Sequence, residues 1–171
     1  MNQIMDLNVL CRLAVELGAD DAKLVSASKI VVRHWVMWKC RFGCEAYGRS
    51  LSCPPFTPTP EETEALLKEY NFGLIFRVKD REKLSKIVIE LERRAFLEGY
   101  YYALGFTSGR CRLCEECNVS GGLCLKPREM RPSMESCGID VFATAENAGF
   151  KLGVLKSSEE SYYGIGLILI K

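Results

Sequence analysis

The stretch Phe72-Gly-Leu-Ile-Phe-Arg-Val78, followed from Asp80 by a long amphipathic segment, decides the fold class. The first part is a short apolar run, which is typical of a buried strand. Residues 80–104 repeat apolar side chains at intervals of three and four, which predicts a helix that ends before Gly105. Its apolar face carries Leu84, Ile87, Val88, Leu91, Ala95 and Tyr102. A buried strand followed by such a helix indicates a sheet covered by helices.

The same patterns predict the other elements on either side of this unit. The expected helices are residues 3–17, a helix that begins with the Thr59 capping box, and residues 139–148. The expected strands are two within residues 22–38, separated near 26–28, and then 106–110, 151–156 and 162–170. In the last strand Gly164 and Gly166 share a face, which indicates close approach by another backbone or a bound group.

Strands and helices therefore interleave along the chain. We expect an α/β or α+β fold with a mixed sheet of about four to six strands and flanking helices. Residues 1–171 are expected to form a single domain, with cysteine-rich loops at about 40–58 and 109–138.

The charge balance excludes several function classes. The 23 basic and 22 acidic side chains give a net charge of +1, so nothing attracts the chain generally to nucleic acid or to acidic membranes. The N-terminal residues show no secretory signal, and no apolar run reaches the roughly 20 residues that span a bilayer. We expect a cytoplasmic protein without nucleic-acid or membrane partners, whose thiols stay reduced.

Seven of the nine cysteines form two groups. The first group is Cys40-x3-Cys44-x8-Cys53, and the second is Cys111-x2-Cys114-x2-Cys117-x6-Cys124 with Pro127 shortly after. Cys137 lies further along the chain, and Cys11 lies on the apolar face of the first helix, where it suits a small core residue. A reducing compartment argues against disulfides and favours metal thiolates.

The second group has the spacing of an iron–sulfur site. Three cysteines separated by two residues wrap around one face of a cubane, and a more distant cysteine near a proline supplies the fourth thiolate. The spacing predicts a [4Fe–4S] cluster on Cys111, Cys114, Cys117 and Cys124, although x6 is longer than the x3 of bacterial ferredoxins. Zinc is the alternative, but it would use two pairs of cysteines and leave Cys117 without a role.

The first group offers only three thiolates for a second cluster. Cys137 is a candidate fourth ligand, or Cys124 crosses over and Cys137 completes the second group. Full ligation is favoured over a three-cysteine cluster, in which one iron would be open to water or substrate and would act as a Lewis acid.

Arginines surround both groups. The candidates for tuning an anionic cluster or for clamping a small anion are Arg41, Arg49, Arg110, Arg112 and Arg131. The alternative is that they are solvated loop charges, partly offset by neighbouring glutamates. His34, the one histidine, lies in a strand pattern and is expected to be structural.

Three motifs in order resemble the uncharacterised family of predicted metal-binding proteins. They run from Lys39 to Pro55, from Cys111 to Cys117 and from Arg131 to Val141. The resemblance covers most of the chain, and implies metal binding in anaerobic bacteria and archaea through the seven grouped cysteines. It also implies that the position of Cys137 often holds another residue, which would leave the first group with three ligands.

We therefore expect an iron–sulfur protein that carries one or two [4Fe–4S] clusters in electron transfer or redox chemistry with a partner protein. One alternative is an enzyme whose open cluster iron binds a small anionic metabolite. Another is a zinc-stapled structural or interaction module. The residues do not decide whether the protein is an enzyme.

Overall fold

The computed structural model describes residues 6–157 and 160–171. The start of the predicted helix 3–17 lies outside these residues. The helices are α1 (Asn8–Glu16), α2 (His34–Gly43), α3 (Pro60–Leu67), α4 (Leu84–Leu97) and α5 (Val141–Asn147), with the 3-10 turns η1 (Ala27–Lys29), η2 (Arg81–Lys83) and η3 (Glu135–Cys137). The strands are β1 (Asp21–Ser26), β2 (Phe72–Val78), β3 (Leu104–Phe106) and β4 (Gly164–Leu169).

The four strands form one sheet in the order β1-β2-β4-β3. All three pairings between named strands are antiparallel, as in Leu74 opposite Ile168 and Phe106 opposite Leu167. The expected sheet with flanking helices is confirmed, and of the two expected classes the fold is α+β. The pairing of these strands is antiparallel, where a mixture of directions was expected.

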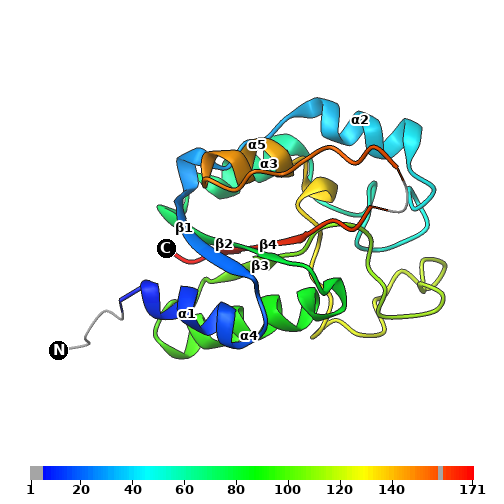
Figure 1. Ribbon diagram of the computed structural model, residues 1–171. Helices are drawn as coiled ribbons and strands as arrows, with labels where there is room; N and C mark the ends of the chain where they lie inside the picture. The colour runs from blue at the N-terminus through cyan, green and yellow to red at the C-terminus, as the bar shows by residue number, and fades with distance from the viewer. Residues whose placement is uncertain (1–5, 158–159) are drawn as a thin grey trace.

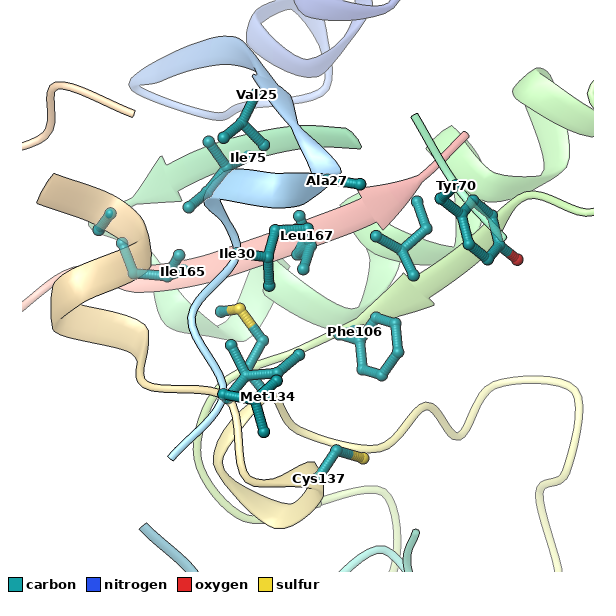
Figure 2. Packing of buried hydrophobic residues seen from close by; sticks show 14 of the residues in the cluster. Val25, Ala27, Ile30, Tyr70, Ile75, Phe106, Met134, Cys137, Ile165 and Leu167 are labelled. Carbon is teal, nitrogen blue, oxygen red and sulfur yellow. The ribbon is translucent and has the colours of Figure 1, made fainter. Parts of the chain in front are cut away.

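Helices cover both faces of the sheet, as Figure 1 shows, with α1 and α4 on one side and α3 and α5 on the other. In β2, Leu74, Phe76 and Val78 pack with the buried residues of α1 and α4, while Ile75 belongs to the opposite core. Every residue of β4 is buried, because this central strand is covered on both faces. Figure 2 shows the core on the α5 side, where Ile165 and Leu167 of β4 meet Ile75 and Val25.

The glycines of β4 explain how closely the layers pack. A side chain on Gly166 would collide with the ring of Phe76, and one on Gly164 would meet Leu84 at 3.2 Å. The close approach expected at these positions is therefore made by side chains of β2 and α4. Gly105 serves the same purpose in β3, where a side chain would meet Val88 of α4.

Three local predictions were wrong. Residues 34–43 form α2 and not a strand, since the four-residue spacing of Val36 and Cys40 gives a helical face despite the β-branched and aromatic composition. Residues 151–156 form no strand. Helix α4 stops at Leu97, well before Gly105, because Gly99 has a φ of +100° that ends the helical path.

Two smaller features also differ from expectation. The short strand β3 begins two residues before the expected 106–110 and overlaps that range only at Phe106. His34 is the first residue of α2, is exposed, and has its Nδ1 3.7 Å from Oε1 of Glu61.

In the part of the chain that the structure describes, no helix is long and apolar enough to cross a bilayer.

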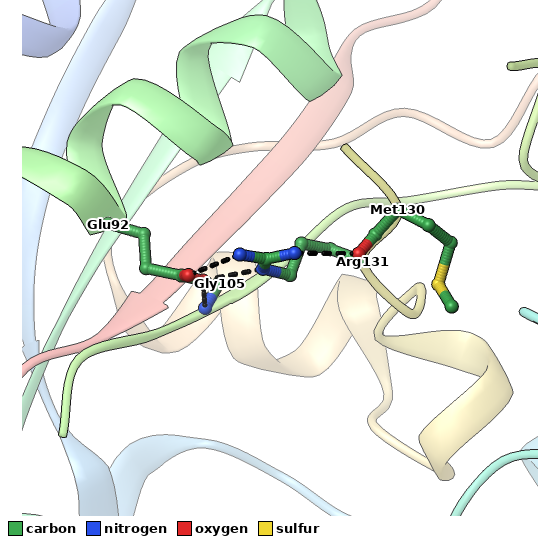
Figure 3. Close-up of polar contacts among 4 residues, drawn as sticks. All are labelled: Glu92, Gly105, Met130 and Arg131. Carbon is green, nitrogen blue, oxygen red and sulfur yellow. Dashed lines mark hydrogen bonds and ion pairs between the residues drawn. The ribbon is translucent and has the colours of Figure 1, made fainter. Parts of the chain in front are cut away.

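An ion pair joins α4, β3 and the loop that follows the second cysteine group (Figure 3). Nε of Arg131 donates to Oε2 of Glu92 at 2.7 Å, and the same oxygen accepts the backbone N–H of Gly105 at 2.6 Å. The side chains of Arg131 and Glu92 are only 20% and 16% exposed, so solvent screens the pair weakly. The hydrogen bond to Glu92 raises the pKa of Arg131.

Replacing this carboxylate tests the importance of the pair. Glu92→Gln keeps the shape of the side chain but removes its charge, and we expect a loss of about 1–3 kcal/mol in the free energy of unfolding. Urea denaturation measures the change. The matched control is Glu90→Gln on the same helix, whose pair with Arg93 is exposed and should matter little. Equal losses in the two variants would contradict the assignment.

Candidate metal centre

Both cysteine groups lie at the same end of the molecule, on the right in Figure 1. The first group begins on α2, which carries Cys40 in its last turn and ends at Gly43, with Cys44 as its C-cap residue. The expectation that this group follows a strand is therefore corrected: it follows a helix. The spacing of four residues brings the two positions one helical turn apart.

A compact loop supplies the third thiol of the first group. Its backbone is closed by a hydrogen bond from the N–H of Gly48 to the carbonyl of Pro54 at 2.9 Å, and Gly48 has a positive φ of 68°. Cys53 donates its own N–H to the carbonyl of Ser50 at 3.0 Å. The thiol of Cys53 is buried, and the loop holds it opposite α2.

Cys40, Cys44 and Cys53 line one cavity of about 470 Å³. Burial, together with smaller effects of the neighbouring Cys44, Glu135 and Cys53, raises the pKa of Cys40 to about 11. Burial also raises the pKa of Cys53, although hydrogen bonds from Ser50 and Ser52 oppose the effect. In the metal-free protein these two thiols are therefore protonated at neutral pH, and a bound metal must displace their protons.

The second group encloses a much smaller space. Cys111, Cys114, Cys117 and Cys124 all line a cavity of about 30 Å³. The six residues between Cys117 and Cys124 form a tight excursion, since Asn118 Nδ2 donates to the carbonyl of Leu123 at 3.0 Å. This closure returns the chain to the other three cysteines despite the long x6 spacing.

The two groups are neighbours in space. The backbone N–H of Leu51, in the first cysteine loop, donates to Sγ of Cys117 at 3.3 Å. Residues 50–52 line the small four-cysteine cavity, whereas the adjacent Cys53 lines the large one. Cys44 and Cys111 also both raise the pKa of Cys53. One short segment, residues 50–53, therefore forms a wall of both cavities.

The four cysteines of the second group are the structure's candidate for a thiolate-ligated metal group. Four thiols surround one space, and one of them already accepts a backbone N–H, an interaction that stabilises a negative sulfur. Among residues 6–157 and 160–171, no three Cys, His, Asp or Glu side chains are grouped closely enough to hold a single metal ion.

Cys137 lies elsewhere. The residue is 1% exposed and belongs to the apolar core with Ile139 and with Met134, the latter labelled beside it in Figure 2. Burial raises the pKa of its thiol to about 11. Its carbonyl accepts the hydroxyl of Thr63 at 2.7 Å, which fixes η3 against α3. Its proposed role as a fourth ligand stays a prediction, and the structure places it in the core beneath the first group.

The five candidate arginines divide into three sets. Arg49, Arg110 and Arg112 line a cavity of about 360 Å³ together with Cys111, Cys114 and Cys117. Arg41 instead packs over the ring of Phe42 at 5.5 Å. Arg131 is engaged by Glu92, so its guanidinium has a structural partner.

The structure adds residues that the sequence analysis missed. Arg81, Tyr162 and Glu135 all line the large cavity with the first cysteine group. The guanidinium of Arg81 lies 4.1 Å from the ring centroid of Tyr162 and donates to its hydroxyl. These three positions lie too far apart in the sequence to form a recognisable motif. They come together because β4 pairs with the rest of the sheet.

The comparisons with known proteins agree with a metal-binding role. Residues 23–170 match the family described as predicted metal-binding protein (DUF2284). No curated protein and no solved structure matches the chain significantly. The match spans all the grouped cysteines and nearly the whole fold, and the chain belongs to this family of predicted metal-binding proteins.

Proposed function

We propose that this protein binds two [4Fe–4S] clusters and transfers single electrons between them and a partner protein. The first cluster would be held by Cys111, Cys114, Cys117 and Cys124, and the second by Cys40, Cys44 and Cys53. The observation that carries the proposal is the enclosure of one small cavity by four thiols, with Leu51 donating to the sulfur of Cys117. A bound cubane would supply a one-electron redox couple.

The surroundings of the thiols support an anionic metal group. Arg49, Arg110 and Arg112 place positive charge on the cavity that adjoins Cys111 and Cys114, partly offset by Glu45 and Glu115. The backbone N–H at Cys117 favours a sulfur with more negative charge. Both effects stabilise the reduced state and raise the reduction potential of a cluster at this position.

A second candidate function is chemistry at an open iron of the three-cysteine cluster. The observation that favours it is the contrast between the sites: three thiols line a cavity of about 470 Å³, while Cys137 is buried in the core. A vacant coordination position beside such a cavity is accessible to a small anion. Zinc remains the alternative metal, and metal analysis separates these possibilities.

The Cys117→Ser variant tests the four-cysteine site. We expect anaerobically purified wild-type protein to contain about eight irons and eight sulfides, and the variant to lose about four of each. Iron, acid-labile sulfide and zinc are measured per chain, together with the visible spectrum. Cys11→Ser is the matched control, because Cys11 lies on α1, packs against the core on that side of the sheet and lies in neither group. A colourless wild-type protein that contains zinc and no sulfide would contradict the iron–sulfur proposal.

Magnetic coupling tests whether the two clusters exchange electrons over a short distance. Because residues 50–53 separate the sites, two reduced clusters would be close enough for their spins to interact. We expect the electron paramagnetic resonance spectrum of the fully reduced wild-type protein to be broadened or split. Cys53→Ser should leave the simple signal of one cluster. An unsplit sum of two independent signals in the wild type argues against adjacent clusters.

Cyanide tests the open-iron candidate. A cluster with three cysteine ligands should bind cyanide and change its resonance signal, whereas a fully ligated cluster should not. The change should persist in Cys117→Ser, which keeps the three-cysteine site, and should disappear in Cys53→Ser. If cyanide leaves the Cys117→Ser spectrum unchanged, the cluster on Cys40, Cys44 and Cys53 is fully ligated.

A further inference from the structure

The large cavity continues well beyond the thiols of the first cysteine group. Besides Cys40, Cys44 and Cys53, it reaches Ile139 in the segment before α5 and Ile165 in the central strand β4. Its volume is about 470 Å³, whereas the cavity that all four thiols of the second group line measures about 30 Å³ and the one that three of them line about 360 Å³. The larger volume falls in the range of small-molecule binding sites.

The walls of this cavity are mostly apolar. Val36 of α2, Ile139 and Ile165 are buried side chains that line it, and Val141 at the start of α5 adds a partly buried methyl surface. Such walls suit a hydrocarbon or aromatic body, whose transfer from water is favourable.

Three cationic side chains line the cavity. Arg81 and Arg110 both line it, and Arg81 is held in place by Tyr162 through a hydrogen bond and ring stacking. Lys39 adds a third positive charge, with its Nζ 5.2 Å from the ring centroid of Trp35.

The acidic groups at the cavity are already engaged. Asp140 caps α5, because its Oδ1 accepts the N–H of Ala143 at 3.0 Å. Glu135 accepts the N–H of Gly109 at 3.3 Å. The three cationic side chains that line the cavity outnumber these two carboxylates, which leaves an excess of positive charge that a monoanion would complement.

We propose that this cavity binds a small monocarboxylate with an apolar body, whose carboxylate pairs with Arg81 and Arg110 while its body lies against Val36, Ile139 and Ile165. A planar guanidinium held by stacking suits a carboxylate because it offers two parallel donors. The inference deepens the second candidate function by naming its ligand class. The side chains of the cavity carry the inference, whatever group the thiols bind.

The test is calorimetric titration with two carboxylates, hexanoate and phenylacetate, and with the corresponding neutral amides. It uses anaerobically purified full-length protein whose iron, sulfide and zinc content is measured on the same sample. We expect the carboxylates to bind and the amides to bind at least about tenfold more weakly, since a charge-assisted pair is lost. Equal binding of acid and amide, or binding of neither acid, overturns the inference.

Variants of the residues that line the cavity distinguish a loss of binding at this site from a general effect on folding. Arg81→Met should weaken hexanoate binding about tenfold, Arg81→Lys should restore part of it, and the control Arg94→Met on the exposed face of α4 should have no effect. Val141→Phe, which narrows the apolar wall without touching the arginines, should weaken acid and amide alike. If Arg81→Met fails to fold, unchanged hexanoate binding by Val141→Phe still overturns the inference.

The titrations and the metal analysis test the carboxylate-binding inference and the metal proposal separately. Arg81-dependent binding of hexanoate to a protein that contains no metal supports the pocket and removes the metal proposal. A protein with full clusters that binds neither carboxylate leaves the metal proposal intact and overturns this inference.

Discussion

The half-buried carboxylate of Glu92 joins the helix, the strand and the loop that position the second cysteine group. It accepts hydrogen bonds from Gly105 in β3 and from Arg131, which lies just after the second cysteine group. Helix α4 approaches β3 closely enough for this contact because Gly105 has no side chain to hold the layers apart. The loop that carries four cysteines has no helix or strand of its own until η3, so its end must be fixed from outside.

A second set of contacts fixes the other side of the site. Thr63 of α3 donates to the carbonyl of Cys137, and Thr57 donates to the carbonyl of Ser136. These bonds join η3 to the chain between the first cysteine loop and α3. The result is that segments far apart in the sequence, near 40–53 and 109–137, meet over one end of the sheet. Metal ligands on loops gain precision from such second contacts.

Much of this arrangement could be predicted from the residues alone, where the signal is local. The run Phe72–Val78 is β2, the capping box at Thr59 starts α3, and the expected helix in 80–104 contains α4. Local signals misled in 34–43, because Trp35, Val36 and Trp38 favour a strand by composition while the spacing of Val36 and Cys40 suits a helix. The aromatic residues of α2 are largely exposed, so no alternation between core and solvent identified the element.

The candidate functional residues show the same difference between local signals and contacts that only the fold creates. Cysteine spacing identified both groups because metal ligation imposes short, regular separations on one loop. Arg81 and Tyr162 carry no such signal, since they meet only when β4 pairs with β2 and brings residue 162 beside the turn after β2. The same pairing makes Ile165 a wall of the large cavity. Because of this sheet topology, the three-cysteine group lies in a cavity that residues of other elements also line. The four-cysteine group adjoins a different space, because three of its thiols line a cavity of about 360 Å³ together with Arg49, Arg110 and Arg112. The two groups therefore differ in their surroundings: apolar side chains such as Ile165 line the cavity of the first, and charged side chains line the cavity of the second.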